Sequence, residues 1–224
     1  MSAGSQGAPR AASEEKRVKG AALIVALSAL LPRLAGAHGA WIDDPAAAQR
    51  LAQGQIIQRS SSEGKDARIQ AAVRIDAPPQ AVWATLKDCA HAPSFIPGLK
   101  RCQRLAAAPD GSWEIIEHVV KYSWLMPTIH SIFRADYHAP RRIDFRRVGG
   151  DLKSEQGTWS LEPGDAGAST LVEYDVAIDP GFWIPQTVIK HTLRKELPEV
   201  LAALRARVEQ RIARGDRPVT AAQR

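Results

Sequence analysis

The feature that most constrains the fold is a stripe of apolar residues near the C-terminal end of the chain. Between residues 179 and 212, apolar side chains recur at the spacing of an α-helix, at positions 188, 189, 193, 197, 201, 204, 208 and 212. Pro185 suits the first turn of such a helix, and Pro198 predicts a kink within one helix rather than two separate helices. A helix of this length with one apolar face needs an extended apolar partner.

The residues before this helix predict a sheet that would provide that partner. Alternating apolar residues indicate a strand at 68–76, and two short helices are expected after it, at 80–87 and 90–95. Further strands are expected at 99–105, 113–124, 128–138, 142–148, 153–162 and 170–178. Turn residues separate these strands and no helical pattern lies between them, which predicts an antiparallel meander.

The segment before the first long strand predicts small elements only. Asp43 or Asp44 is a suitable N-cap for a short helix within residues 43–53, with Pro45 in its first turn. A short strand is expected at 55–58, and the serine-rich stretch at 60–66 is expected to be a loop.

The first 37 residues have the order of a secretory signal peptide. A basic segment ending at Lys19 precedes about a dozen mostly apolar residues, and Ala35 and Ala37 form a small-residue cleavage site. The apolar segment is short for a membrane span, although an uncleaved anchor is the alternative. We therefore expect export to a periplasm and a mature chain that begins near His38. An N-terminal extension at 38–66, a domain at 67–213 and a flexible tail at 214–224 would follow.

The charge of the chain argues against a nucleic-acid partner. The formal net charge is +6, and about half of this excess falls within the first 37 residues. The remainder is too weakly basic to predict binding to DNA or RNA.

Five short stretches carry a resemblance to a known family. They are IDAPPQAVWATLKD (75–88), PSFIPGLKRCQRL (93–105), VKYSW (120–124), GTWSLEP (157–163) and LPEVLAALRARVE (197–209). In this order they resemble the START and Bet v 1-like (SRPBCC) superfamily, and within it the coenzyme Q-binding and polyketide cyclase-type branch. The resemblance implies an α+β helix-grip fold. A curved antiparallel sheet of about six or seven strands would wrap around the long C-terminal helix, with two short helices after the first strand.

The resemblance also implies a cavity between the sheet and the long helix that holds a hydrophobic molecule. Residues of this chain that could line such a cavity are Phe95, Tyr122, Phe133, Tyr137, Phe145, Trp159, Tyr174, Phe182, Trp183 and Val188. The same side chains could instead fill an ordinary core. If there is a cavity, we expect the ligand to pass between the loops at 179–184 and 95–99, beside Phe182 and Trp183.

The sequence does not decide which face of the strand expected at 113–124 points inward. One face carries Glu117 and Lys121 among apolar residues, and the other carries His118 and Tyr122. An inward Glu117–Lys121 pair would be structural or would hold a polar group of a ligand. Inward His118 and Tyr122 could polarise a carbonyl, but no carboxylate lies at a spacing that would orient the histidine, which favours a non-catalytic role.

The remaining polar residues predict no metal, cofactor or catalytic motif. His118, His130 and Asp136 match no known spacing of metal ligands. His130 and His138 are expected on a solvated face. The pairs Arg141-Arg142 and Arg146-Arg147 indicate a charged sheet edge or, as the alternative, a surface for transient contact with anionic lipid.

The two cysteines, Cys89 and Cys102, allow one disulfide. An oxidising compartment would permit the bond. Both positions are usually apolar in the resembling family, however, which favours two free buried thiols.

Three functions remain open at this stage. The family resemblance favours non-enzymatic binding or transport of a lipid, quinone or similar apolar molecule. The first alternative is a polyketide cyclase or aromatase-like enzyme that uses polar residues inside the same cavity. The second is an interaction module whose cavity is vestigial.

Overall fold

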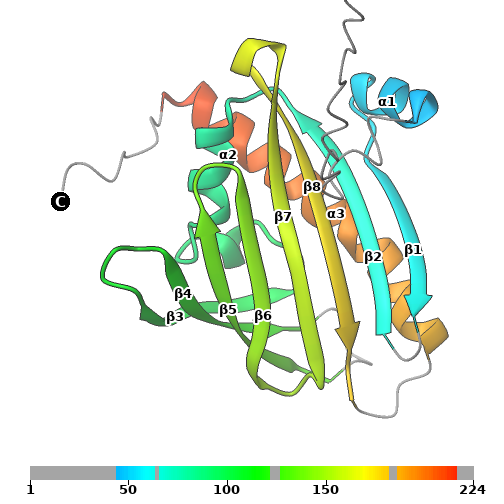
Figure 1. Cartoon of the computed structure of the whole chain (residues 1–224), viewed down its shortest axis with the longest axis vertical. Coiled ribbons are helices and arrows are strands. Elements are labelled where there is room, and N and C mark those ends of the chain that lie inside the picture. The colour runs from blue at the N-terminus through cyan, green and yellow to red at the C-terminus, as the bar shows by residue number, and fades with distance from the viewer. Residues whose placement is uncertain (1–43, 64–65, 122–126, 182–185, 216–224) are drawn as a thin grey trace, which may run out of the picture. The chain divides into compact units, whose positions relative to one another are not determined.

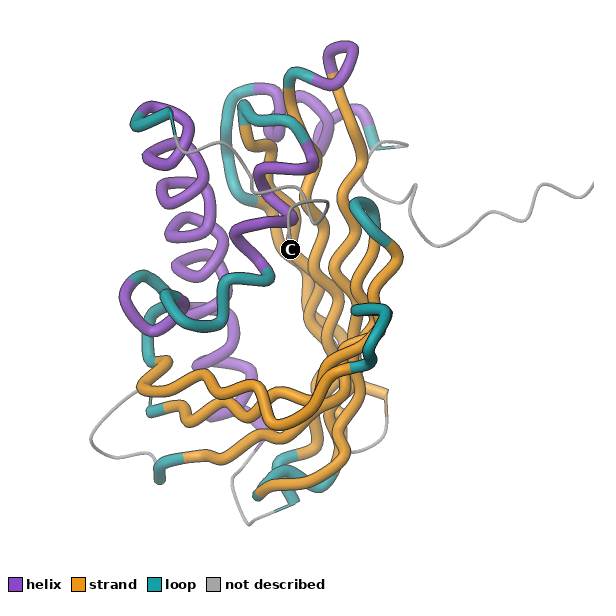
Figure 2. The backbone as a smooth tube through the Cα atoms, turned by 90° about the vertical axis from the view of Figure 1, so that its left-hand side faces the viewer, coloured by secondary structure: helices purple, strands orange, loops and turns teal. Residues whose placement is uncertain are grey.

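The computed structural model describes residues 44–63, 66–121, 127–181 and 186–215, which lie within one compact unit. In these residues a single antiparallel sheet of eight strands has the order β1-β2-β8-β7-β6-β5-β4-β3. Figure 1 shows the strands in this order, with α3 running along one face of β2. Figure 2 shows that the sheet is strongly curved and that the helix lies on its concave side. The predicted helix-grip architecture is therefore confirmed.

The strands are β1 (Ile57–Glu63), β2 (Asp66–Ile75), β3 (Leu99–Ala107), β4 (Trp113–Val120), β5 (Ile129–His138), β6 (Arg142–Gly150), β7 (Ser154–Gly164) and β8 (Ser169–Asp179). The helices are α1 (Pro45–Ala52), α2 (Pro79–Leu86) and α3 (Gln186–Ala213), and short 3₁₀ turns occur at η1 (Ala92–Ser94) and η2 (Asp165–Gly167). None of the described helices is long and apolar enough to cross a membrane.

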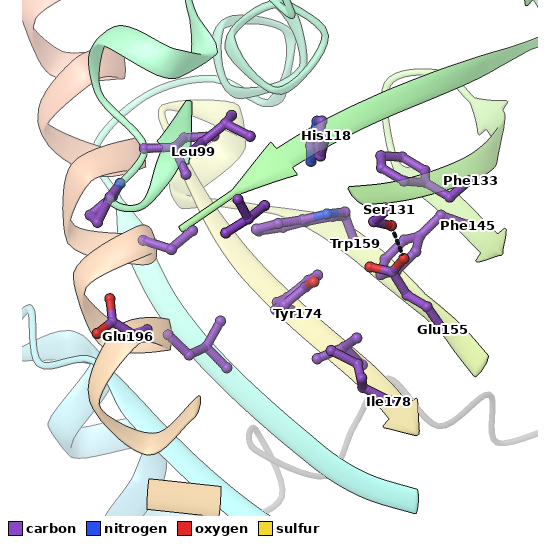
Figure 3. A pocket seen from close by; sticks show the side chains of 16 residues that line it. Leu99, His118, Ser131, Phe133, Phe145, Glu155, Trp159, Tyr174, Ile178 and Glu196 are labelled. Carbon is purple, nitrogen blue, oxygen red and sulfur yellow. Dashed lines mark hydrogen bonds between the residues drawn. The ribbon is translucent and has the colours of Figure 1, made fainter. Parts of the chain in front are cut away.

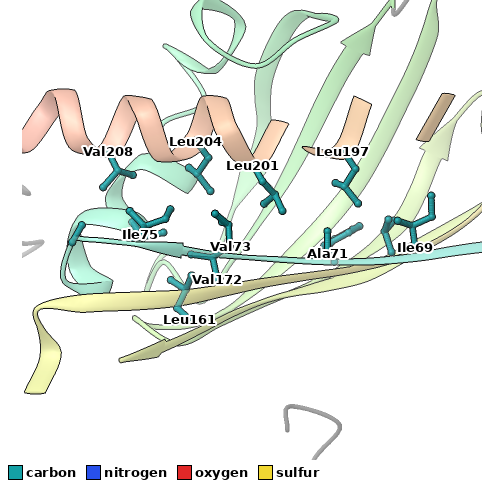
Figure 4. Packing of buried hydrophobic residues seen from close by; sticks show 14 residues of the cluster. Ile69, Ala71, Val73, Ile75, Leu161, Val172, Leu197, Leu201, Leu204 and Val208 are labelled. Atoms are coloured by element: carbon teal, nitrogen blue, oxygen red, sulfur yellow. The ribbon is translucent and has the colours of Figure 1, made fainter. Parts of the chain in front are cut away.

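The main core lies between α3 and β2. Leu197, Leu201, Leu204 and Val208 of α3 pack against the inward residues of β2, which are Ile69, Ala71, Val73 and Ile75. Figure 4 shows the two rows facing each other. Leu201 and Val208 have no exposed surface. Full burial of one such side chain is worth about 1.5–3 kcal/mol, so this row fixes the helix on the sheet.

The C-terminal helix continues through Pro198 as one element of 28 residues. The prediction of one helix rather than two is confirmed. The tertiary contacts on both sides of Pro198 explain this, because Leu197 and Leu201 are both buried against the sheet and hold the flanking turns in place.

On the opposite face of the sheet, α1 packs against β1 and β2. The Asp44 carboxylate caps α1 by accepting from the backbone N–H groups of Ala46 and Ala47, at 3.0 and 3.4 Å. The side chains of Ala47 and Leu51 are buried against Ile57 and Ala72. The predicted short helix is therefore present, and Asp44 is its cap.

Two expectations about local structure differ from the structure. Residues 60–63 are not a loop but continue β1, because they form the antiparallel ladder with β2 that pairs Ser60 with Ile69. This strand brings the sheet to eight strands, more than the six or seven expected. The expected second short turn of helix is present as the 3₁₀ turn at Ala92–Ser94, which the 96–98 turn follows closely.

The expectation of free thiols was also wrong, since Cys89 and Cys102 form a disulfide. Their Cα atoms are 5.4 Å apart, which suits the bond. The bond ties the segment after α2 to β3, and both cysteines pack against the cluster of Ile116, Ala135 and Ile143.

Candidate ligand-binding site

A cavity of about 180 Å³ lies between the concave face of the sheet, α3 and the segment that leads into β3. The sheet contributes most of its wall through β4 to β8, as Figure 3 shows. The residues that line it are Ile96, Pro97, Leu99, His118, Val120, Ser131, Phe133, Phe145, Glu155, Trp159, Tyr174, Val176, Ile178, Glu196, Leu197 and Val200.

A row of five rings crosses the floor of this cavity. Trp159 and Tyr174 lie 4.0 Å apart by ring centroids, and Tyr174 stacks with Phe145 at 5.9 Å. Phe145 meets Phe133 edge to face at 5.9 Å, and Phe133 meets His118 in the same way at 4.9 Å. The row occupies five neighbouring strands, because each ring lies at an inward position of its own strand. It presents an extended aromatic surface to the cavity.

Gly157 makes room for this row. A Cβ atom at this position would lie 2.5 Å from the Cζ atom of Phe145 and would also collide with the backbone carbonyl of Asp175. The missing side chain therefore lets the Phe145 ring lie across β7. This is a physical reason for the glycine at the start of the GTWSLEP stretch.

The inward face of β4 carries Glu114, Ile116, His118 and Val120. Glu117 projects to the other side, where its carboxylate accepts from Arg101 at 2.6 Å. His118 is enclosed by protein except where its ring borders the cavity. Burial lowers the pKa of His118 to about 4, so its imidazole is neutral at pH 7.

Next to His118 is a second polar group, formed by Ser131 and Glu155. Ser131 pairs with His118 across β4 and β5, so the two side chains share one face. The Ser131 hydroxyl donates a hydrogen bond to the Glu155 carboxylate, drawn as the dashed line in Figure 3. The residue of β6 that pairs with Ser131 is Gly150, so no side chain stands between them. Burial raises the pKa of Glu155, while the bond from Ser131 and the charge of Arg147 oppose this rise.

The side of the cavity opposite the floor is formed by two segments. Ile96, Pro97 and Leu99 come from the turn into β3, and Leu197 and Val200 come from α3. Glu196 is the charged residue of α3 among those that line the cavity. The predicted access route includes residues 182–185, which lie outside the described residues, so that route stays a prediction.

The predicted cavity residues fall into three groups. Phe133, Phe145, Trp159 and Tyr174 line the cavity together. Phe95 and Tyr137 are not part of its wall. Tyr122, Phe182 and Trp183 lie outside the described residues, as does the side chain of Val188.

Tyr137 serves a neighbouring polar network instead. Its hydroxyl donates to Glu114 at 2.7 Å, its ring meets Trp83 edge to face, and the Lys87 ammonium lies 3.9 Å from its centroid. Burial, together with the bond to Glu114, raises the pKa of Tyr137. Phe95 is half-buried near Arg207 of α3, whose guanidinium lies 5.9 Å from the ring centroid.

Three polar residues of the cavity were not predicted from the sequence, namely Ser131, Glu155 and Glu196. A usable signal was present for two of them. Ser131 has the same parity as Phe133 on β5, and Glu155 has the same parity as Trp159 on β7. A polar residue within an inward row is costly to bury, and this alone would have marked both as candidates.

The described histidines do not come together with acidic residues at a metal site. Within the described ranges, no group of three or more His, Cys, Asp and Glu side chains is arranged to hold a metal ion. His118 borders the cavity, whereas the imidazole of His130 lies 3.4 Å from Glu117 on the other face.

The arginines around β6 are not at a sheet edge. β6 lies between β5 and β7, so the interpretation of these residues as edge protection was wrong. Arg141, Arg142 and Arg146 are paired with Glu162, Asp144 and Asp136 on the outer face. The Arg146–Asp136 pair links β6 to β5, whereas Arg142 and Asp144 lie on the same strand. Contact with anionic lipid remains an untested prediction.

A curved antiparallel sheet that grips one long helix over an apolar cavity defines a helix-grip ligand-binding domain. Residues 75–205 match the family described as polyketide cyclase/dehydrase and lipid transport, and the chain belongs to this family. No match to a curated protein is found.

Several solved structures share the fold. A START superfamily protein from Mycobacterium smegmatis has a TM-score of 0.57 and 23% identity over 64% of this chain and 97% of its own. The Zhui aromatase/cyclase from Streptomyces sp. R1128 has a TM-score of 0.57 and 16% identity over 66% of this chain and 96% of its own. A STAR-related lipid transfer protein from Xanthomonas axonopodis has a TM-score of 0.57 and 16% identity over 68% of this chain and 99% of its own. At these identities the likeness establishes the START-like fold alone.

Proposed function

We propose that this protein binds a hydrophobic small molecule without transforming it, in the cavity between the sheet and α3. The observation that carries the proposal is the continuous aromatic floor, in which Phe133, Phe145, Tyr174 and Trp159 present ring surface to the cavity. Open apolar surface of this kind is favourable only when something apolar covers it.

The size of the cavity restricts the ligand. An apolar protein cavity of about 150 Å³ admits benzene, and this one is about 180 Å³. A molecule of one or two fused rings, or one ring system of a larger molecule, matches this volume. A whole phospholipid does not, unless the cavity enlarges on binding.

The polar residues of the cavity favour binding over catalysis. His118 has an edge-to-face contact with Phe133 but, among the described residues, no hydrogen bond to either ring nitrogen. A general base needs an oriented imidazole with a pKa near the working pH, and a pKa of about 4 makes His118 a weak base.

A cyclase-like enzyme is the second candidate. It is favoured by the placement of Ser131 and Glu155 on the same face as His118, since proton transfer in a cavity requires neighbouring groups of this kind. In this alternative, the ligand would leave the cavity with a changed mass or ring structure.

We also propose that the protein acts after export. The order of the first 37 residues supports this, and so does the Cys89–Cys102 disulfide, since such bonds persist mainly in oxidising compartments.

Native mass spectrometry of the protein purified from its own cells tests the proposed function. We expect a bound molecule of low polarity that is recovered unchanged after incubation with fresh protein. Conversion of that molecule by wild type, but not by a His118→Phe variant, would establish the enzyme instead.

A cavity-filling variant provides the matched control. Val200→Trp places a large side chain in the cavity wall and should weaken binding of the neutral probe N-phenyl-1-naphthylamine about tenfold or more. Val148→Trp introduces the same side chain at an exposed position of β6 and should leave binding unchanged. Equal binding by wild type and Val200→Trp would show that the cavity is not the binding site.

A further inference from the structure

The polar end of the cavity contains more hydrogen-bond acceptors than donors. The Ser131 hydroxyl donates its hydrogen to Glu155, which leaves the serine oxygen and the remaining lone pairs of the Glu155 oxygens as acceptors. A neutral imidazole adds one N–H donor and one acceptor nitrogen. His118 has no hydrogen-bond partner among the described residues, so both nitrogens are available to a molecule in the cavity.

Acidic residues outnumber Lys and Arg along the described wall of the cavity. Glu155 lines the cavity, whereas Arg147, the cation that acts on Glu155, is not among the lining residues. The Arg147 guanidinium is directed at its own strand, where it donates to the backbone carbonyl of Gly150 at 3.0 Å. Glu196 adds a second carboxylate on the α3 side. An anionic ligand group would therefore lie beside carboxyl groups, with no Lys or Arg among the described residues that line the cavity.

The polar end and the aromatic floor are continuous. His118 is at once the last ring of the floor, in contact with Phe133 at 4.9 Å, and the neighbour of Ser131 across β4 and β5. A flat molecule that lies on the rings thus brings a substituent on its edge to His118, Ser131 and Glu155.

From this arrangement we infer that His118, Ser131 and Glu155 select a neutral, flat ring molecule that carries a hydrogen-bond-donating group, such as an aromatic hydroxyl, and that they reject carboxylates. The hydroxyl donates to Glu155 and accepts from the His118 N–H. The inference rests on the proposed binding function and adds the chemical class of the ligand.

Three probes with one ring system test the selection. Naphthalene, 2-naphthol and 2-naphthoate differ only in the substituent, and their dissociation constants are measured by calorimetric or tryptophan-fluorescence titration at pH 7. We expect 2-naphthol to bind about tenfold more tightly than naphthalene, and 2-naphthoate to bind more weakly than naphthalene.

Variants locate the effect. His118→Phe keeps the ring but removes both nitrogens, and Glu155→Met removes the carboxylate at similar size. Each should reduce the preference for 2-naphthol over naphthalene to about twofold or less, while naphthalene still binds. Glu162→Met, the same substitution on the outer face of β7, should leave the preference intact.

The outcomes separate this inference from the proposed function. If naphthalene binds and 2-naphthol has no advantage, or if 2-naphthoate binds best, the selection is overturned and cavity binding stands. If none of the three probes binds, both are overturned. The wild-type series alone decides these cases, so the test does not depend on the folding of any variant.

Discussion

The concave face of the sheet contains two regions that differ in how they are filled. Along β2, small and branched aliphatic side chains meet the leucines of α3 and leave no exposed surface at Ala71, Val73 or Leu201. Across β4 to β8, large rings face a cavity of about 180 Å³. Both regions show the same alternation of inward and outward residues.

The difference arises from what covers each strand. α3 lies along β2, and its aliphatic row interdigitates with the row beneath it (Figure 4). The curvature of the sheet (Figure 2) carries β4 to β6 away from this line of contact, and a cavity remains beside the rings of these strands. The comparison shows that inward alternation identifies the face but not whether the face is closed.

Leu201→Ala should disrupt the closed region most. Leu201 has no exposed surface, and removal of such a leucine costs about 2–5 kcal/mol of the free energy of unfolding. Urea denaturation measures the loss, with Val148→Ala on the exposed end of β6 as the control. A loss under 1 kcal/mol would contradict close packing between α3 and β2.

Removal of the disulfide should loosen the cavity side. Its two cysteines are 13 residues apart, and closure of a loop of this length is worth about 3 kcal/mol. A Cys89→Ala/Cys102→Ala variant should lose about this much, with faster hydrogen exchange in β3 than in β2. Wild type should have no titratable thiol when denatured without reductant, and two such thiols would rule out the bond.

The pH dependence of stability should reveal the buried His118. Its pKa is about 4 in the folded protein and about 6.5 in an unfolded chain, so the unfolded chain binds the proton more readily between these values. Stability should therefore fall as pH drops from 7 to 4.5, by up to about 3 kcal/mol from this residue.

Comparison with His118→Phe isolates this contribution. Glu155 faces the same cavity and titrates in the opposite sense, but it is present in both proteins. As the pH falls from 7 to 4.5, the free energy of unfolding of the variant should rise relative to that of wild type. A difference that is the same at pH 7 and 4.5 would show that His118 is solvated.

Phe133→Leu should have the smallest effect on stability. Phe133 is half-buried beside the cavity, and a hydrophobic replacement at such a site costs less than about 1.5 kcal/mol. The ring contacts with His118 and Phe145 disappear, so binding of N-phenyl-1-naphthylamine should weaken several-fold. Unchanged binding would mean that the aromatic floor does not contact the probe.

Much of the fold could be predicted from local patterns. The stripe at 197, 201, 204 and 208 identified the helical face that contacts β2, and the parity of β5 and β6 placed Phe133 and Phe145 inward. These predictions succeed because the periods of helix and strand are properties of the backbone. The loop expected at 60–63 failed because serines lack a strong strand signal, and pairing with β2 supplies the hydrogen bonds.

The candidate site was predicted only in part. Four ring residues were recognised because aromatic side chains at inward positions are visible in sequence. The sequence did not decide which face of β4 points into the cavity, since either face carries polar groups. Only the pairing of His118 with Ser131 shows which face this is.

The sequence by itself determined the order of elements, the inward rows and the helix that crosses them, because these depend on residues close together in the chain. Only the tertiary structure decided that Cys89 bonds to Cys102, that Glu155 reaches Ser131 past Gly150, and that α3 covers β2 but leaves the aromatic floor open. These features depend on the curvature and register of the sheet, which arise from the sum of many weak pairings between strands and from no single local pattern.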